Sequence, residues 1–481
     1  MRPRPARSVL PSEGSDLDQA SSRVSLAGTA ASEPGRLLSG AAVPLVQKMA
    51  TDSRRIPPGP AEKYHPAQDL LEWMSEQFAR FGDIYKASIY GADAYVVSDP
   101  DYAQHVLVKN WQNYVKGQAI NRVAFLLGNG LMVSEGAFWR SQRRMMQPAF
   151  HRKAIAALTD LITTANIRLL ENWEEAARQR KSVNVTHDVS RMVLEIVLRS
   201  IFGDEYEDIG PRFNILSEVT TRDLEFARAF GSLRKIVRDV AARRRKGDSA
   251  RPDILGMLMN AVDRETGRAM TEPQLVNEIM TLVVAGHETT ASTLNWIWYL
   301  ISQHANVEEK LSNELASLRA GEFPSMEDLP RFAYTRQVID ETLRLYPAGW
   351  LMTRRALSDD QLGAYFVPAG TEIYISPYFI QRHPDLWEDP HRFNPDRFDP
   401  DQSVDRPRRA MLAFSAGPRN CIGELLARVE MQLHLLVVAR RLRLRYAQTK
   451  PLELEAGVNL RSRHDFIMMP ERKTAAESTA P

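Results

Sequence analysis

The only cysteine of the chain lies in a segment whose residue types suit metal ligation. Cys421 follows a tight turn at Gly417 and Pro418, and an apolar helical pattern begins directly after it at Ile422. Unpaired backbone N–H groups and the helix dipole favour a thiolate at a helix N-terminus. Gly423 has no side chain to prevent a flat group from lying against the backbone. These are the requirements of a sulfur ligand to haem iron, although a lone cysteine is more often buried and inert.

A second segment that could carry chemistry is AGHETT, residues 285–290. It lies inside a long apolar stretch, 271–302, that has the pattern of one helix. The carboxyl group of Glu288 and the hydroxyl group of Thr289 could together move protons. The alternative is structural: Thr289 bonds back to the Ala285 carbonyl and Glu288 is solvated.

Glu341 and Arg344 lie three residues apart in a segment with a helical pattern that Pro347 ends. At that spacing both side chains share one helix face. Taken alone, they indicate a surface ion pair worth about 0.3–0.5 kcal/mol.

The elements that must position these residues are mostly helical. The pattern predicts a helix over 69–82, a small hairpin over 84–98 and further helices as far as residue 345. A strand is expected within 370–379, and a last long helix after the cysteine. The fold class is therefore mainly α with minor β.

No linker rich in Pro, Gly or Ser interrupts the middle of the chain, so we expect one large domain over 59–475. Residues 1–58 are rich in Arg, Ser, Ala and Pro and are expected to form a disordered tail, with a second disordered end at 476–481.

Composition excludes several classes of protein. Hydrophobic residues make up 44% and charged residues 25%, and the net charge is +2, which gives no support to nucleic-acid binding. One cysteine excludes an intramolecular disulfide and a cysteine-rich zinc site, and it fits a reducing cytoplasmic setting. No run of 18 apolar residues occurs, so no transmembrane segment is predicted.

The segment FSAGPRNCIG, residues 414–423, resembles the haem-binding loop of the cytochrome P450 family, in its soluble bacterial type, at every defining position. The resemblance extends over roughly residues 60–475. AGHETT resembles the family's oxygen-binding motif, with Glu in place of the more frequent Asp. Glu341 and Arg344 resemble its Glu-x-x-Arg helix. The resemblance implies a helix-rich haem-thiolate fold with small sheets, and haem b (iron protoporphyrin IX) as cofactor.

It also implies roles for individual residues. Cys421 would be the axial ligand, and Glu288 and Thr289 would be the acid–alcohol pair that manages protons. Arg397 would complete a buried triad with Glu341 and Arg344. The residues expected to hold the haem are Trp139, Arg143, Arg355, Arg419, Phe414, Gly423 and Ala285. Those expected to contact substrate are Phe125, Leu126, Ala285, Trp350, Leu351 and His464.

The function implied is a monooxygenase that inserts one atom of dioxygen into a small apolar substrate such as a lipid, a terpenoid or another secondary metabolite. Electrons are expected from a separate ferredoxin or flavodoxin and its reductase. Candidate docking residues are Arg140, Arg144, Arg408, Arg409 and Arg428. The alternatives are a haem-thiolate peroxygenase or rearrangement enzyme, and a haem-binding protein without turnover.

The segment that covers the pocket in the family is short in this chain. Arg243 lies only 40 positions after Gly203, and residues 213–240 have room for two moderate helices with almost no loop. We expect either a wide entrance or a lid completed by another molecule. A bulky lipid or terpenoid, or a substrate tethered to a carrier protein, would suit such an entrance.

Overall fold

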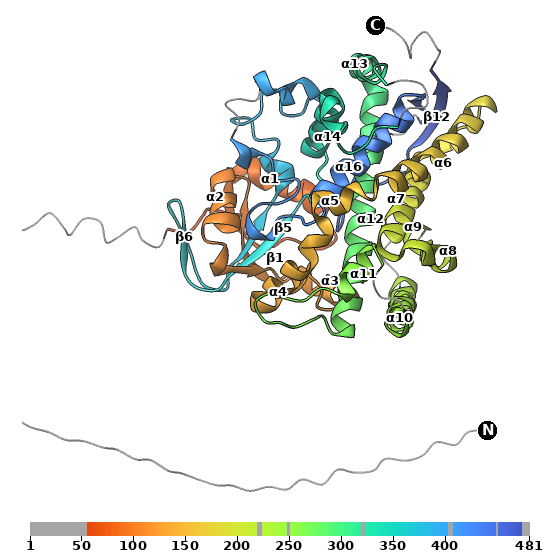
Figure 1. The fold of residues 1–481 in the computed structure, drawn as a ribbon. Helices are drawn as coiled ribbons and strands as arrows, with labels where there is room; N and C mark the ends of the chain where they lie inside the picture. The colour runs from red at the N-terminus through yellow and green to blue at the C-terminus, as the bar shows by residue number, and fades with distance from the viewer. Residues whose placement is uncertain are drawn as a thin grey trace, which may run out of the picture. The chain divides into compact units, whose positions relative to one another are not determined.

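In the described part of the chain, helices predominate and four small sheets lie beside them (Figure 1). The computed structural model describes residues 55–218, 224–247, 251–318, 323–402, 407–448 and 451–473. The predicted mainly α fold with minor β is confirmed.

The helices are α1 (Leu70–Phe81), α2 (Pro100–Gln104), α3 (Ile120–Leu127), α4 (Gly136–Met146), α5 (Arg152–Ala156), α6 (Thr159–Arg178), α7 (Val185–Phe202), α8 (Tyr206–Ile209), α9 (Ile215–Glu218), α10 (Leu224–Lys246), α11 (Ile254–Met259), α12 (Glu272–Gln303), α13 (Ala305–Leu315), α14 (Ala333–Leu345), α15 (Pro377–Ile380) and α16 (Glu424–His434).

The strands are β1 (Ile84–Ile89), β2 (Ala92–Val97), β3 (Tyr114–Lys116), β4 (Val183–Asn184), β5 (Met352–Ala356), β6 (Asp360–Leu362), β7 (Tyr365–Val367), β8 (Glu372–Ile375), β9 (Leu442–Tyr446), β10 (Leu454–Ala456), β11 (Leu460–Ser462) and β12 (Ile467–Arg472). The largest sheet has the order β1-β2-β8-β5-β3, and β10 and β11 form a separate hairpin.

Local sequence signals determine where several of these elements begin and end. Asp69 caps α1 by accepting hydrogen bonds from the backbone N–H groups of Leu71 and Glu72, and Gly82 ends it at a positive φ of 81°. Thr271 and Gln274 form a capping box that starts α12. These helices are therefore the predicted ones.

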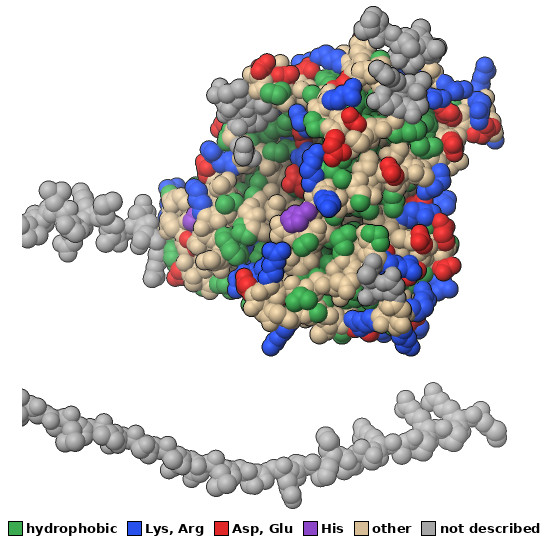
Figure 2. Space-filling model, viewed as in Figure 1, with side chains coloured by type: hydrophobic (Ala, Val, Ile, Leu, Met, Phe, Trp, Pro, Cys, Tyr) green, Lys and Arg blue, Asp and Glu red, His purple; other side chains and the backbone are tan. Residues whose placement is uncertain are grey.

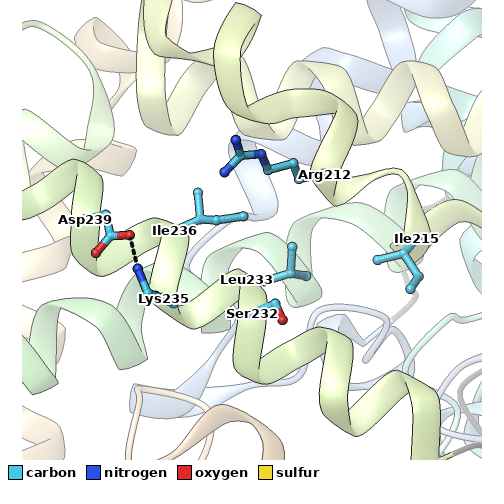
Figure 3. A pocket seen from close by; sticks show the side chains of 7 residues that line it. All are labelled: Arg212, Ile215, Ser232, Leu233, Lys235, Ile236 and Asp239. Atoms are coloured by element: carbon cyan, nitrogen blue, oxygen red, sulfur yellow. Dashed lines mark hydrogen bonds and ion pairs between the residues drawn. The ribbon is translucent and has the colours of Figure 1, made fainter.

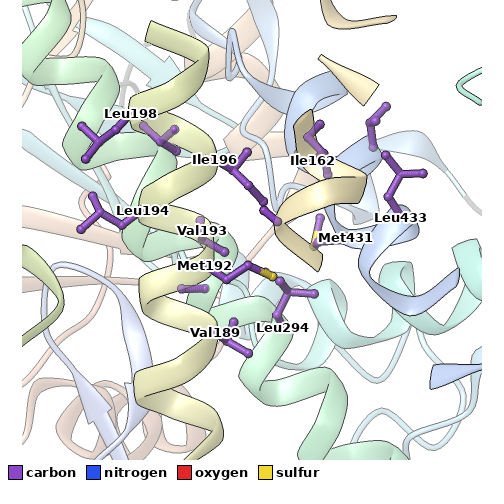
Figure 4. Close-up of a cluster of buried hydrophobic side chains, with 14 of the residues drawn as sticks. Ile162, Val189, Met192, Val193, Leu194, Ile196, Leu198, Leu294, Met431 and Leu433 are labelled. Atoms are coloured by element: carbon purple, nitrogen blue, oxygen red, sulfur yellow. The ribbon is translucent and has the colours of Figure 1, made fainter. Parts of the chain in front are cut away.

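The largest hydrophobic core of the described residues lies where α7 packs against α12 and α6, and α16 packs against α6 and α12 (Figure 4). Met192 and Val193 of α7 are buried there, as are Leu294 of α12 and Met431 of α16. Because α12 and α16 are packed into the same core, the segments that carry AGHETT and Cys421 have fixed positions relative to each other.

The covering segment, expected to hold two moderate helices, is described only in part. Within the described residues, α9 spans Ile215–Glu218 up to the edge of the undescribed 219–223, and α10 has 23 residues. A 3₁₀ turn over Gly210–Phe213, with Pro211 in its first turn, precedes α9, so that α9 begins only at Ile215. Residues 219–223 lie outside the described parts of the chain, so the open entrance stays a prediction.

Residue contacts divide the chain into two units, Met1–Thr51 and Asp52–Pro481. Of the expected tail over 1–58, residues 1–54 are outside the described part, and so is the expected C-terminal end at 476–481. The domain boundaries at 59 and 475 therefore stay predictions. None of the helices in the described parts combines the length and apolar character that crossing a membrane requires.

Candidate active site

The cysteine loop joins a short 3₁₀ turn, Gly417–Arg419, to helix α16. The backbone N–H of Cys421 donates to the carbonyl of Phe414, 2.9 Å away, which closes the loop. Gly417 has a φ of 73°, and a Cβ there would lie 2.1 Å from the Leu107 carbonyl oxygen, so only glycine fits. At Gly423 an added Cβ would meet only the Cys421 sulfur, 4.0 Å away. The loop thus leaves space beside the thiol.

The Cys421 thiol keeps exposed surface at the wall of a recess of about 310 Å³, while dense protein surrounds the rest of it. Burial raises its pKa, and Glu424 adds to this. The backbone N–H groups of Gly423 and Glu424 and the charge of Arg143 act in the opposite direction. The expected helix-end stabilisation is therefore present but smaller than the effect of burial. A bound metal cation would add the remaining stabilisation of the Cys421 thiolate, since coordination favours the deprotonated form.

A buried cluster of cations lies beside the loop. Lys116 of β3 and Arg354 of β5 are cross-strand neighbours, and Arg419 acts electrostatically on both. Burial lowers the pKa of Lys116 to about 7 and that of Arg354 to about 10. Glu135 is the acid that pairs with Arg419. The Nε of Arg419 is buried without a hydrogen-bond partner among the described residues.

This cluster corrects one of the predicted haem-binding residues. The side chain of Arg355 is exposed and lies in register with Glu372, whereas Arg354 is 9% exposed and lies towards Arg419. Neighbouring residues of a strand point to opposite faces, so only one of the two arginines can join the cluster. Arg354, not Arg355, therefore belongs to the site.

Trp139 and Arg143 lie on α4, one turn apart. Trp139 is buried, and the guanidinium of Arg419 stands 5.4 Å from its ring centroid. Arg143 donates to the backbone carbonyl and the side chain of Asn420 at 2.9 and 3.0 Å. Helix α4 is therefore bound to the cysteine loop. Phe414 helps to close the cysteine loop, because its carbonyl accepts the hydrogen bond from the Cys421 N–H. Its ring lies under the guanidinium of Arg428.

The AGHETT segment lies in the interior of α12. The Thr289 hydroxyl donates to the Ala285 carbonyl at 2.7 Å, which is the backbone bond considered as the structural alternative. His287 is buried, and its Nε2 lies 2.9 Å from the Ser190 hydroxyl of α7. Glu288 accepts a hydrogen bond from Asn459, and burial raises its pKa. Glu288 is thus half-buried, and its carboxylate is bonded to a residue outside its own helix.

The structure brings Glu341, Arg344 and Arg397 together. Arg344 donates to both carboxylate oxygens of Glu341 at 2.6 and 2.8 Å, and Arg397 donates to the same carboxylate at 3.0 Å. The Glu341 and Arg344 side chains are 0% exposed. Arg344 also donates to three backbone carbonyls, those of Gln381, Pro390 and Arg392. This is a buried network and not the surface pair that the spacing alone indicates.

The residues expected to contact substrate do not all share one place. Phe125 is 85% exposed. Trp350 is buried and donates through Nε1 to the Gly457 carbonyl at 3.0 Å. The His464 side chain is 40% exposed, with Nε2 4.0 Å from a Glu453 carboxylate oxygen. Leu126 and Leu351 are half-buried against core clusters. Phe125 is exposed, Trp350 is held in packing and the His464 side chain is partly exposed, so their expected contact with substrate stays a prediction.

A second recess, of about 480 Å³, lies at the covering segment (Figure 3). Figure 3 shows Arg212 and Ile215 on one side and Leu233, Ile236 and other α10 residues on the other. It shares no lining residue with the recess at Cys421.

The residues present fit a haem with a thiolate ligand. Arg354, Arg419 and, below its pKa of about 7, Lys116 carry positive charge beside the acid Glu135, and Glu278 also acts electrostatically on Lys116. The positive charge of the two arginines suits the two propionates of a haem. The unpartnered Nε of Arg419 and the open space at Gly423 agree with that assignment.

Four residues of this site were missed from the sequence: Lys116, Glu135, Arg354 and Asn459. Lys116 and Arg354 come from different strands, and only the strand pairing shows that they are neighbours. The alternation of β5 could have distinguished Arg354 from Arg355. Asn459 carries no motif, and its position follows from the fold alone.

Comparison with known proteins agrees with this geometry. The family described as Cytochrome P450 matches residues 59–220 and 211–469. Cyclooctat-9-en-7-ol 5-monooxygenase of Streptomyces melanosporofaciens is 35% identical over 76% of this chain and 83% of its own length. Pentalenene oxygenase of Streptomyces avermitilis is 31% identical over 76% of this chain and 84% of its own length.

Two solved structures have the same fold. The haem domain of cytochrome P450DA has a TM-score of 0.80 at 23% identity, covering 89% of this chain and all of that one. Retinoic acid bound cyanobacterial CYP120A1 also has a TM-score of 0.80 at 23% identity, covering 88% of this chain and all of that one. With the cysteine loop, the cation cluster and the buried Glu-x-x-Arg network all in place, the chain belongs to the cytochrome P450 family and is a haem-thiolate monooxygenase.

Proposed function

We propose that the chain oxygenates a terpenoid, by hydroxylation or epoxidation, and that its cofactor is haem b. The observation that carries the substrate class is the relative named as acting on cyclooctat-9-en-7-ol, which is 35% identical over most of this chain. Pentalenene oxygenase supports the same class. The short covering segment favours a bulky substrate, or one presented by a carrier protein.

The haem, when bound, supplies the activation of dioxygen for insertion of one oxygen atom. Cys421 would ligate its iron, and Trp139, Lys116, Arg354 and Arg419 would hold its propionates. Arg143 keeps the cysteine loop on helix α4 through Asn420.

Protons are managed by two neighbouring side chains of α12. Thr289 supplies a hydroxyl, which must release the Ala285 carbonyl in order to donate elsewhere. Glu288 supplies the acid, since burial raises its pKa and so makes its proton available nearer neutral pH.

Electrons come from a separate ferredoxin or flavodoxin with its reductase. Of the docking residues considered, Arg140 is exposed, whereas Arg144, Arg409 and Arg428 are held by ion pairs with Asp263, Asp101 and Asp340. The Arg408 side chain lies outside the described residues. Figure 2 shows basic side chains lying among acidic ones on the face of α4, α5 and α16. Arg140 is thus the best candidate for attracting an acidic partner. The single cysteine supports a reducing, cytoplasmic location.

The proposal is tested by turnover with a ferredoxin, its reductase and NADPH, after a screen of terpene hydrocarbons, terpene alcohols and fatty acids for shifts of the Soret band. We expect terpenoids to give the shift and to be converted with NADPH consumption coupled to product. Thr289→Ala should retain haem and divert reducing equivalents to peroxide. Product formed from peroxide alone would favour the peroxygenase alternative, and no turnover with any donor would favour a haem-binding protein.

A further inference from the structure

The acid of the AGHETT segment is held from a distant part of the chain. Nδ2 of Asn459 lies 2.8 Å from Oε2 of Glu288 and donates to it. Asn459 belongs to the turn between β10 and β11, whereas Glu288 lies in the middle of α12. The polar partner of this acid is therefore set by the C-terminal hairpin.

The backbone on both sides of Asn459 is fixed. Nε1 of buried Trp350 donates to the Gly457 carbonyl at 3.0 Å. On the other side, the Leu460 carbonyl accepts from the Ser292 hydroxyl at 2.9 Å, and the Leu460 N–H donates to the Ala348 carbonyl at 3.0 Å. An amide between two anchored residues is preorganised, so little entropy is lost when it binds Glu288.

The tip of the hairpin connects this contact with the surface. Val458, next to Asn459, is 70% exposed. Arg461, two residues on, forms an ion pair with Glu455 at 3.2 Å and is 37% exposed. One hairpin therefore carries both the residue that holds the acid and a charged pair that reaches water.

The charges around Glu288 have opposing effects. Burial raises its pKa, and the positive charge of Arg461 and the hydrogen bond from Asn459 lower it. His287 of the same helix lies against Ser190 of α7, and burial keeps its pKa at about 4, so it is neutral near pH 7. Among the described residues, Arg461 is thus the charged group that lowers the pKa of Glu288, and the Asn459 amide contacts the carboxylate directly.

We propose that Asn459 is a positioning residue for proton delivery: its amide holds the Glu288 carboxylate towards the hairpin, on the side from which protons enter. Donation to a carboxylate favours the charged form, so the bond keeps the acid ready to take up a proton from solvent. When the protonated carboxyl releases Asn459, it is free to turn towards Thr289. This inference rests on the proposed role of Glu288 as the proton-delivering acid.

The direct test measures the pKa of Glu288 in the resting ferric protein. It is obtained from the pH dependence of the Glu288 carboxyl band in difference infrared spectra. Glu288→Gln identifies the band by removing it. Asn459→Leu, which removes the donor, should raise the Glu288 pKa by about one unit. Asn459→Asp, which keeps the shape and adds a negative charge, should raise it further. Asn459→Gln keeps an amide donor, so the Glu288 pKa should rise less than in Asn459→Leu. Val458→Ala, at the exposed tip, should leave the carboxyl band unchanged.

Turnover provides the second readout. In Asn459→Leu the fraction of electrons lost to peroxide should increase several-fold, and the pH profile of coupling should move to higher pH, with the Soret spectrum unchanged. If Glu288 ionises identically in wild type and in both the Leu and Asp variants, the inference is overturned. If Glu288→Gln itself leaves coupling unchanged, the proposed role of Glu288 fails, whereas a shifted band in Asn459→Leu would still establish the contact.

Discussion

Two buried sets of charges in this molecule have opposite balances. In the network of Glu341, Arg344 and Arg397, every charged group is paired within the protein, and Arg344 uses its remaining donors on backbone carbonyls. In the cluster of Lys116, Arg354 and Arg419, two arginines and a lysine whose pKa lies at about 7 interact with Glu135, and Glu278 also acts on Lys116. The Nε of Arg419 is buried without a hydrogen-bond partner among the described residues.

The difference separates a structural role from a binding role. A buried charge is tolerated when it is paired and hydrogen-bonded, so the first set is complete and stabilises only the fold. The second set is electrostatically incomplete, and an anionic ligand would lower its energy. The same physical rule thus identifies which buried arginines hold the chain together and which hold a cofactor.

Breaking the complete network should have the largest effect. Glu341→Gln leaves two buried guanidinium groups without their carboxylate, which costs about 3–5 kcal/mol. We expect little or no folded, haem-containing protein, measured as the Soret-to-280 nm absorbance ratio of the purified chain. Glu453→Gln removes one partner of the exposed pair with Arg463 and serves as the control, with no measurable loss. Normal haem content in Glu341→Gln would contradict the role assigned to the network.

A buried acid that forms no ion pair with any described residue sharpens the contrast. Burial raises the pKa of Glu430 in α16 from 4.5 to about 8. Since the folded-state pKa is the higher one, the stability from this group is fully present below pH 4.5 and is lost as the pH rises through about 8. Glu430→Gln should therefore melt at a similar temperature to wild type at pH 5 and several degrees higher at pH 9. Parallel melting curves across this range would contradict the assignment.

The incomplete cluster should respond to the loss of one cation by holding its ligand less tightly. Arg354→Leu removes a buried partner for a propionate, so haem transfer to an apomyoglobin acceptor should be about tenfold faster than in wild type. Arg355→Leu is a matched control one residue away, and its rate should stay within about twofold because that side chain is exposed. If haem transfer were faster from Arg355→Leu than from Arg354→Leu, Arg355 would be the haem-binding residue.

Much of this arrangement could be predicted from the sequence because short motifs determine it. The cysteine loop, the capping box of α12 and the Glu341–Arg344 pair each depend on residues a few positions apart. The parts that were missed depend on contacts between distant segments. Arg354 differs from Arg355 only by the face of β5 on which it lies, and Asn459 reaches Glu288 only because the C-terminal hairpin packs against α12.

The central claim is that Cys421 provides a thiolate ligand to haem iron, and one spectrum tests it most directly. Reduced wild-type protein exposed to carbon monoxide should show the strongly red-shifted Soret band of thiolate ligation. Cys421→Ser should lose that band, with any bound haem absorbing at shorter wavelength, and Arg355→Leu should keep it. The same red-shifted band in Cys421→Ser would contradict the account.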